Sequence, residues 1–272
     1  MASGWPINLG NADEIKAAAL GLGLVQARLM PMFLLVPFLN RNMVPRVASF
    51  GLAAALGLLV LPTLPLKEIP MGGELILILV KEGLIGLVMG FVLALPFWMF
   101  EALGFLVDNQ RGASMAATTN PTTGNDSTPV GQLTGLAFIT FFMVSGGLEL
   151  MLGMIYDSYR QWAPLSFWPQ WKEESVVLLI QQLNRLLTIG LLLAAPAMMA
   201  MFLAELGLAL ANRFTPQLQV FFLAMPIKSA LGLFVLALGA TIIFDFANEP
   251  IRELGSWIQR LNGVWGGPRS HE

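Results

Sequence analysis

The stretch Val47–Leu66, VASFGLAAALGLLVLPTLPL, decides the fold, because it runs for 20 residues without a charge. A helix that crosses a bilayer needs about 20 apolar residues, so this run predicts a membrane-spanning helix. Similar runs, charged at one position at most, recur along the chain at Ala17–Leu39, Gly83–Phe100, Val130–Leu148, Leu186–Ala204 and Ser229–Phe244. The sequence therefore predicts an all-α integral membrane protein of five or six hydrophobic helices.

The composition supports the same class of protein. The chain has 272 residues, of which 56% are hydrophobic and 12% charged, and its mean hydropathy is +0.70. An ordinary soluble domain carries roughly 25% charged residues, so this chain lacks the charge to cover its surface in water. The net charge is −2 and no basic run is present. Nucleic-acid binding, which needs clustered Lys and Arg to neutralise phosphates, is therefore not expected.

Residue counts exclude most catalytic and metal chemistry. The chain has no Cys, and its one His is His271, next to the C-terminal residue. Disulfides, thiolate metal sites and a Cys nucleophile are impossible, and a Ser-His-Asp arrangement has no suitably placed base. Neither a phosphate-binding P-loop nor a dinucleotide fingerprint occurs. We expect no enzyme activity, no cofactor and no metal.

Acids at the ends of the apolar runs leave two interpretations open. Glu101, Glu149, Glu205 and Asp245 each follow such a run. Acids at membrane depth are often functional, which would make the chain a secondary transporter or channel for a small solute. Acids at span ends can equally sit at the interface and stop the helix. Arg213 follows Glu205 by two turns on roughly the same face, so Glu205 is the strongest functional candidate.

Basic residues also lie inside the hydrophobic segments, at Arg28, Lys81, Arg185 and Lys228. Such positions are unusual for lipid-facing helices and indicate faces that contact protein or water. If the chain has six spans, the basic residues of the loops divide six to four between the two sides. That difference is too small for the positive-inside rule to set an orientation.

Small residues and prolines predict close packing and kinks. Gly86/Gly90 and Gly131/Gly135 are small-residue pairs at helical spacing, which lets a second backbone approach. Pro96, Pro196 and Pro226 lie inside hydrophobic segments, where each removes a backbone donor and kinks the helix unless neighbours compensate. The helices are therefore expected to be Pro-kinked and tightly packed, some of them as hairpins.

Three segments outside the apolar runs have distinct characters. Residues 108–130 form a small, polar loop rich in Ser, Thr, Gly and Pro, which cannot face lipid as irregular backbone. Residues 157–174 form an aromatic loop, either at the membrane interface or packed on the core. Residues 248–262 form an amphipathic helix, with Ile251, Leu254, Ile258 and Leu261 on one face, that would lie on a membrane or a partner. Residues 263–272 are expected to be a flexible tail.

Two motifs resemble a known family. Asp108-Asn-Gln-Arg-Gly-Ala-Ser114, followed by Asn120-Pro121, Gly124 and Ser127-Thr-Pro129, resembles the central loop of the T component of the type III secretion export apparatus. A second motif is similar to a later stretch of that family, which includes the flagellar R protein. It comprises Ala195-Pro196, Glu205, Asn212-Arg213-Phe-Thr-Pro216-Gln217, Phe221-Phe222 and Met225-Pro226-Ile-Lys228. The Asp-Asn-Gln-Arg-Gly form favours the injectisome branch over the flagellar one.

The resemblance implies a non-enzymatic role in protein secretion. Residues 1–262 would form one export-apparatus domain that assembles with the R and S components into a helical pore, beside the U and V components. Unfolded secreted proteins would enter through that pore. The resemblance implies a multi-pass location in the bacterial inner membrane, in contact with lipid, with helices lifted towards the periplasm. It also implies that the charges inside segments are compensated by partner chains, which would leave the isolated chain poorly stable.

The resemblance further implies a plug at the pore lumen. The plug would be the 108–130 loop, with Arg111 as its anchor; a rigid connector without a gating role is the alternative. The candidate gate residues are Asn109, Gln110, Arg111, Gly112, Ser114, Met115, Asn120, Pro121, Gly124 and Pro129. The candidate packing and assembly residues are Pro196, Glu205, Arg213, Pro216, Gln217, Phe221, Phe222, Pro226 and Lys228.

Overall fold

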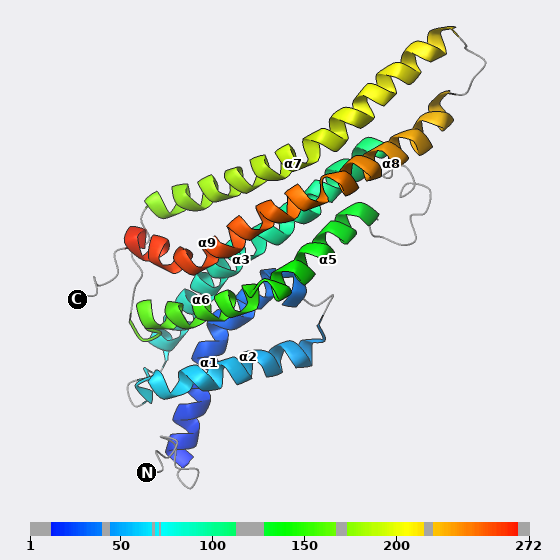
Figure 1. Cartoon of the computed structure of the whole chain (residues 1–272). Coiled ribbons are helices and arrows are strands. Elements are labelled where there is room, and N and C mark those ends of the chain that lie inside the picture. Colours follow the sequence, from blue (N-terminus) through cyan, green and yellow to red (C-terminus); the bar gives the residue numbers. More distant parts are fainter. Residues whose placement is uncertain are drawn as a thin grey trace. The chain divides into compact units, whose positions relative to one another are not determined.

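The fold was examined in a computed structural model that describes residues 12–39, 44–66, 69–70, 72–112, 128–166, 173–214 and 220–265. All regular secondary structure in these ranges is helical, as predicted (Figure 1). The α-helices are α1 (Ala12–Leu35), α2 (Arg46–Val60), α3 (Gly73–Arg111), α5 (Pro129–Val144), α6 (Gly147–Gln161), α7 (Glu173–Phe214), α8 (Val220–Leu238) and α9 (Ala240–Trp265). Short 3₁₀ turns follow α1 at η1 (Pro37–Leu39) and α2 at η2 (Leu61–Thr63).

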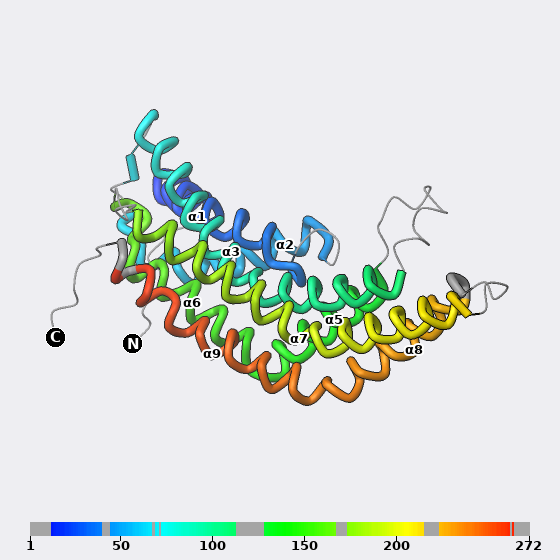
Figure 2. Tube along the Cα trace, turned by 90° about the horizontal axis from the view of Figure 1, so that it is seen from above, coloured from blue at the N-terminus to red at the C-terminus, as the bar shows by residue number. Residues whose placement is uncertain are grey.

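The chain forms two compact units. Unit 1 comprises Met1–Ala94, Leu148–Leu179 and Glu253–Glu272, and unit 2 comprises Leu95–Gly147 and Ile180–Arg252. Unit 1 therefore holds α1, α2, α6 and the first part of α3, whereas unit 2 holds α5, α8 and most of α7. Within unit 2, α7 and α8 lie side by side in both views (Figures 1 and 2).

Unit 1 is built on a close crossing of α1 and α3. A side chain at Gly86 would collide with the backbone carbonyl of Arg28, and a Cβ at Gly90 would lie 2.8 Å from the Cα of Met32. Only glycine at both positions allows the two backbones to approach this closely. Around the crossing, the unit buries apolar side chains that include Leu24, Val25, Leu29, Met32, Ile85, Met89, Met151, Met154 and Ile155. The close packing predicted for the Gly86/Gly90 pair is confirmed.

Unit 2 has an aromatic core between α3 and α5. The ring of Phe100 stacks on that of Phe138 at a centroid distance of 4.3 Å. The ring of Phe97 meets Phe138 edge-on at 4.9 Å and Phe142 at 5.1 Å. Such geometries add about 0.5–1.5 kcal/mol per pair to the burial of apolar area. These contacts fix α5 against the second half of α3, which positions the two ends of the polar segment between them.

Four helices are long and apolar enough to span a membrane, or up to six if two bent pairs each count as one span. This agrees with the prediction of five or six hydrophobic helices. Two of the helices are much longer than a bilayer requires: α3 has 39 residues and α7 has 42. At 1.5 Å per residue they extend for about 58 and 63 Å, twice the roughly 30 Å hydrocarbon core. Each therefore projects beyond the hydrocarbon or crosses it steeply tilted.

Kinks at the three prolines stay a prediction, because the helices that contain them are unbroken and their bending at proline is not resolved by the helix bounds. Pro96, Pro196 and Pro226 lie inside α3, α7 and α8, which continue past them. The two breaks occur next to glycines instead. Gly146 has a φ of +78° between α5 and α6, and a bend of 57° separates α8 from α9 around Gly239. A positive φ costs glycine little, so the chain turns at Gly146 without strain.

Two expected loops are partly helical. The last turn of α3 includes Asn109, Gln110 and Arg111, so the polar segment begins at Gly112 rather than at residue 108. Likewise, α6 runs to Gln161, so the aromatic loop begins five residues later than the predicted residue 157. In both places polar side chains led the sequence analysis to end the helix too early.

The aromatic loop residues pack into the molecule. Tyr159, on α6, and Trp162, just after it, are both buried. The core-packing alternative is therefore correct for these two residues, and the interfacial one is wrong for them. Trp168 and Trp171 lie outside the described residues.

The amphipathic segment is helical, as predicted, but its apolar face is covered within the chain. Residues 248–262 belong to α9, which starts at Ala240 and continues to Trp265. Leu254, Ile258 and Leu261 are buried, and a side chain at Gly255 would contact Leu150 of α6. The expectation that this face lies on a membrane or a partner is therefore wrong.

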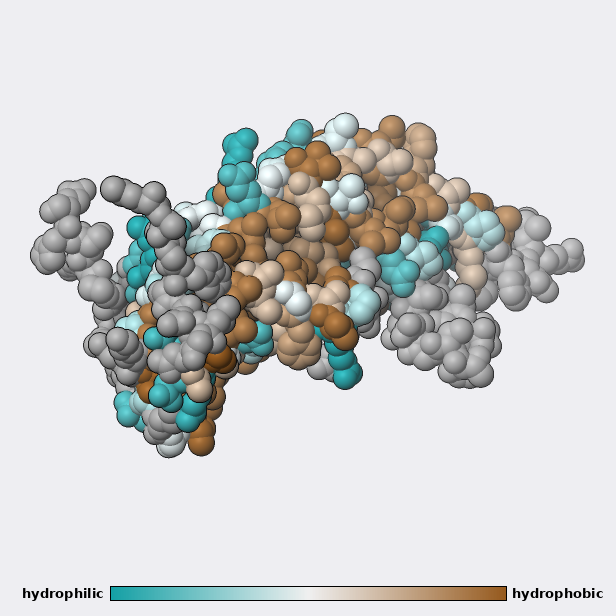
Figure 3. Space-filling model, turned by 90° about the horizontal axis from the view of Figure 1, so that it is seen from below, coloured by the Kyte–Doolittle hydropathy of each residue, from teal (hydrophilic) through white to brown (hydrophobic). Residues whose placement is uncertain are grey.

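Many large apolar side chains remain on the surface. Figure 3 shows a broad apolar area on one face of the molecule. Exposed residues on α7 alone include Leu187, Leu191, Leu192, Met199, Phe202, Leu203, Leu206, Leu210 and Phe214. Continuous apolar surface of this kind marks contact with lipid or with other proteins.

Candidate functional site

The base of the polar segment is held by the buried carboxylate of Asp108, near the end of α3. Only 1% of this side chain is exposed. Its Oδ2 accepts hydrogen bonds from the backbone N–H groups of Val130 at 2.8 Å and Gly131 at 3.2 Å. These are unpaired donors at the start of α5, whose own N-cap residue, Thr128, makes no side-chain cap. Asp108 therefore caps α5 from another helix, where its charge also suits the positive helix end.

Arg111 connects this cap to α8. Its Nε and Nη2 donate to Oδ1 of Asp108 at 2.7 and 2.6 Å. Its Nη1 donates to the hydroxyl of Ser229 at 3.1 Å. The helix ends at once, because Gly112 has a φ of +89°, a conformation that favours glycine. Asp108, Arg111, Val130, Gly131 and Ser229 together are called the clamp below.

The clamp ties the two ends of the polar segment to one carboxylate. The segment leaves α3 one residue after Arg111 and returns at Pro129, the first residue of α5. Proline is favoured there because its missing N–H would have no helical partner. Of the predicted gate residues, Asn109, Gln110, Arg111, Gly112 and Pro129 lie at this base. Ser114, Met115, Asn120, Pro121 and Gly124 lie outside the described residues.

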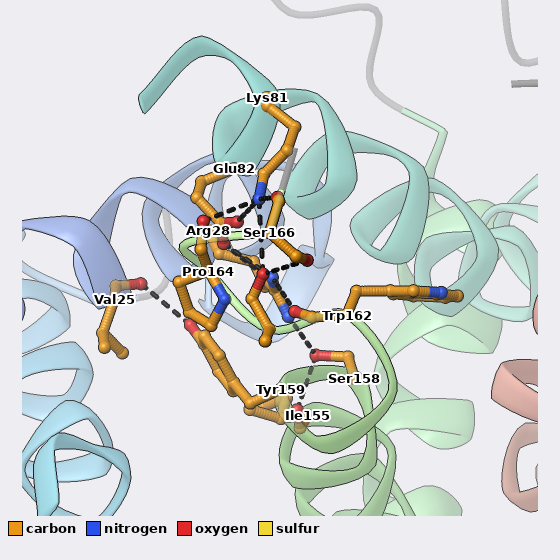
Figure 4. A network of polar contacts seen from close by, with 11 residues as sticks. Val25, Arg28, Lys81, Glu82, Ile155, Ser158, Tyr159, Trp162, Pro164 and Ser166 are labelled. Atoms are coloured by element: carbon orange, nitrogen blue, oxygen red, sulfur yellow. Dashed lines mark hydrogen bonds and ion pairs between the residues drawn. The ribbon is translucent and has the colours of Figure 1, made fainter. Parts of the chain in front are cut away.

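A second polar cluster lies in unit 1 and centres on Arg28 and Glu82 (Figure 4). Arg28 is 1% exposed and Glu82 is fully buried, with Nη2 and Oε2 2.7 Å apart. Arg28 also donates to the hydroxyl of Ser158 at 3.1 Å and to the carbonyl oxygen of Trp162 at 2.8 Å. Its guanidinium lies 4.2 Å above the ring of Tyr159. Each donor nitrogen thus has a partner, as a buried charge requires.

Lys81, on α3, belongs to the same cluster and connects it to the residues that follow α6. Its Nζ lies 2.8 Å from Oε1 of Glu82 and donates to the carbonyl oxygens of Pro164 and Ser166, at 2.7 Å each. The cluster holds two cations and one carboxylate, so it carries a formal charge of +1. The carbonyl groups after α6 offset this excess, because a helix C-terminus carries partial negative charge.

The other two cations inside segments are paired in unit 2. Lys228 Nζ on α8 lies 3.2 Å from Oε2 of Glu205 on α7, and Arg185 Nη2 lies 2.6 Å from Oε1 of Glu249. All four cations predicted to need partner chains therefore have partners within the chain, and that expectation is wrong. Glu205 also pairs with a different residue from the one its spacing suggested. Its cation is Lys228, whereas Arg213 is exposed at the end of α7.

The remaining assembly candidates are scattered over α7 and α8. Pro196 on α7 and Pro226 on α8 are exposed. Phe221 and Phe222 lie in the first turn of α8, and Pro216 and Gln217 lie outside the described residues. The acids Glu101, Glu149 and Asp245 are exposed on three different helices. In the described part of the chain no group of three or more acids or His could hold a metal ion.

Sequence reasoning missed Glu82, Ser158 and Ser229. Glu82 had a usable signal, because Lys81-Glu82 interrupts one apolar run and Arg28 interrupts another. Opposite charges in two such runs suggest a buried pair. The two serines had none, since each acts only through an arginine more than 100 residues away.

Fold and charge pairing together define a multi-pass, all-α membrane protein. The family model for bacterial export proteins, family 1, matches residues 19–254. The chain is 40% identical over 242 residues to Yop proteins translocation protein T of Yersinia pestis, which covers 88% of this chain and 92% of that protein. The chain therefore belongs to this family of bacterial export proteins, as a T component of a type III secretion export apparatus related to the flagellar protein FliR.

More distant relatives come from both branches of the family. The surface presentation of antigens protein SpaR of Salmonella typhimurium is 28% identical over 226 residues, with 82% of each chain covered. The flagellar biosynthetic protein FliR of Bacillus subtilis is 28% identical over 225 residues, with 81% of this chain and 86% of that protein covered. The higher identity to the Yersinia protein favours the injectisome branch, as the Asp108–Gly112 motif predicted.

Proposed function

We propose that this chain is a core subunit of the inner-membrane export gate and closes it with its polar segment. It forms the entrance pore for unfolded substrate proteins together with the R and S components, beside the U and V components. Its role is structural rather than enzymatic. The relatives carry names from protein translocation, antigen presentation and flagellar biosynthesis. Those names, with the family match, support the export role.

The clamp is the observation that carries the gating part of the proposal. A connector between α3 and α5 needs no buried charge. Here Asp108 is buried, uses both oxygens, and binds a helix start and an arginine that reaches α8. A plug needs such a fixed base, because its tip must return to one position after each substrate passes. Arg111 acts as the anchor, and the residues between Gly112 and Pro129 act as the plug.

Deleting residues 117–124 tests the gating role. We expect the deleted variant to assemble and to make the membrane leaky to ions or small molecules. The matched control replaces the same eight residues by an equal length of Gly and Ser, which preserves the connection. This replacement keeps the length of the segment and removes its side chains. If the side chains close the pore, the variant with the replacement leaks as the deletion variant does; if length alone closes it, only the deletion variant leaks. A tight membrane in the deletion variant, with assembly intact, would overturn the plug and leave a connector.

Co-expression with the R and S components tests the assembly itself. We expect a large hetero-oligomer that contains this chain when the complex is extracted in mild detergent and weighed by native mass spectrometry. A lone monomer or homodimer under the same conditions would contradict the export-gate role. It would instead support the alternative that the chain transports a small solute, for which Glu101 and Glu205 are the residues to substitute in a transport assay.

A further inference from the structure

A pocket of about 360 Å³ opens in unit 1 between the end of α2 and the end of α6. Its size falls in the range of about 300–1,000 Å³ that is usual for sites of small ligands. The walls are mainly apolar, with Val60, Leu64 and Leu165 among the lining residues. Thr63, Tyr156, Tyr159 and Arg160 contribute polar groups, of which the Thr63 and Tyr159 hydroxyls already donate to backbone carbonyl oxygens. The pocket therefore combines an apolar interior with one cation.

Arg160 differs from the cations inside the apolar segments. Arg28, Lys81, Arg185 and Lys228 all have carboxylate partners. Arg160 is exposed and forms no hydrogen bond or ion pair with the described residues. Among the described residues, no carboxylate competes with a ligand for this guanidinium. A planar guanidinium matches the oxygens of a phosphate or a carboxylate with two parallel hydrogen bonds.

The pocket lies where one candidate membrane span ends. The candidate span Arg46–Thr63 ends at the pocket, since Val60 and Thr63 both line it. The bent pair formed by α5 and α6 ends at Gln161, one residue after Arg160. One candidate span therefore ends beside Tyr156 and Arg160, and a second does if the bent pair counts as one span. Amphipathic aromatics and basic residues gather where spans leave the hydrocarbon.

The polar cluster around Arg28 holds the pocket wall in place. Tyr159, which lines the pocket, donates its hydroxyl proton to the carbonyl oxygen of Val25 at 2.9 Å. Pro164, another lining residue, is held through its carbonyl oxygen by Lys81 (Figure 4). A wall fixed in this way exists before the ligand arrives, so binding does not incur the cost of ordering it.

We propose that this pocket binds an anionic phospholipid. Its phosphate pairs with Arg160 near the hydroxyl of Tyr156, and an acyl chain lies against Val60, Leu64 and Leu165. A soluble phosphate would leave the apolar wall in water, and an apolar ligand would leave Arg160 unpaired. An anionic amphiphile satisfies both features. The proposal needs only the membrane location of the chain and does not depend on the gating role of the polar segment.

Native mass spectrometry of the purified full-length chain tests the proposal. The chain is mixed with phosphatidylglycerol or with phosphatidylcholine of the same acyl chains, and the lipid retained at increasing collision energy is measured. We expect phosphatidylglycerol to be retained preferentially. Arg160→Gln should lower its affinity about tenfold, the effect of losing roughly 1.4 kcal/mol of binding. Arg252→Gln, at an exposed arginine of α9 outside the pocket, is the matched control and should change nothing.

A second variant fills the pocket without removing charge. Ala163 lines the pocket and is exposed, so Ala163→Trp adds bulk without replacing a buried side chain. It should abolish selective retention, whereas Ala55→Trp, at an exposed position of α2 outside the pocket, should not. Equal retention of both lipids, or no effect of Arg160→Gln, would overturn the proposal. So would displacement of the lipid by millimolar inorganic phosphate, which indicates a site for soluble phosphate. Crosslinking of a partner protein to this pocket in the assembled complex would overturn it as well.

Discussion

Two carboxylates carry most of the polar organisation of the chain. Asp108 closes the base of the polar segment, and Glu82 holds two cations in the interior of unit 1. Both are buried and each binds more than one group. A buried charge that loses its partner keeps its desolvation penalty without the compensating attraction. Substitutions at these acids should therefore cost far more than substitutions at exposed acids.

Glu82→Gln is expected to destabilise the chain strongly. The amide removes the one negative charge that both Arg28 and Lys81 contact in the described structure. Breaking a buried pair by removing one partner typically costs about 3–5 kcal/mol. The measurement is thermal unfolding of the purified protein in a mild detergent. The loss should appear as a melting temperature well below that of the unmodified chain.

Glu74→Gln provides the matched control on the same helix. Glu74 is exposed in the first turn of α3, where its charge is worth at most about 1 kcal/mol. Its melting temperature should stay close to that of the unmodified chain. If Glu82→Gln and Glu74→Gln have the same melting temperature, the Arg28–Glu82 pair does not stabilise unit 1.

At the scale of elements, the sequence predicts where helices lie better than where they end. An apolar run depends on composition alone, so Gly83–Phe100 identifies the centre of α3. The helix extends from Gly73 to Arg111 because backbone hydrogen bonds, not hydropathy, decide its length. Glu82, Glu101 and Asp108 all stay within it. The clamp and the Arg28 cluster could not be predicted, because their partners are brought together only by the tertiary fold.

Gly86→Ala tests the close crossing of α1 and α3. The added methyl would collide with the backbone carbonyl of Arg28, which cannot move aside as a flexible side chain could. Overpacking of this kind usually costs about 1–3 kcal/mol. The same unfolding assay measures it.

Gly83→Ala is the matched control one turn away. A Cβ there would lie 3.8 Å from the carbonyl oxygen of Ala27, an ordinary contact. Because alanine favours the helix by about 1 kcal/mol over glycine, this variant should be neutral or slightly more stable. Equal destabilisation by both substitutions would indicate that the crossing is looser than described.

The whole molecule combines satisfied internal charges with a large exposed apolar surface. The cations inside its apolar segments have carboxylate partners within the chain. The helix α7, by contrast, is about 63 Å long and exposes apolar side chains along this length. The hydrocarbon can cover only about 30 Å of a helix that crosses it upright. If α7 crosses upright, the apolar surface beyond the hydrocarbon needs another cover, and a partner protein would supply it on assembly.

Cysteine labelling can locate that surface, because the chain has no native Cys. Leu192 and Leu210 are both exposed on α7, at 64% and 62%. They lie 18 residues apart, or about 27 Å along the helix. In the isolated chain in membranes, we expect a membrane-impermeant maleimide to label Leu210→Cys and to spare Leu192→Cys, which lipid shields. Buried Ala194→Cys is the control that stays unlabelled throughout.

Assembly should then change one site only. With the R and S components present, the label at position 210 should be lost, because a protein surface replaces water there, while position 192 stays unlabelled. Protection of both positions in the isolated chain would mean that α7 lies steeply tilted inside the bilayer. Exposure of position 210 in the complex would place that end of α7 at a water-filled surface. Either result would contradict the hypothesis that this end of α7 is exposed to water until a partner protein covers it. The labelling pattern therefore decides whether the length of α7 drives assembly.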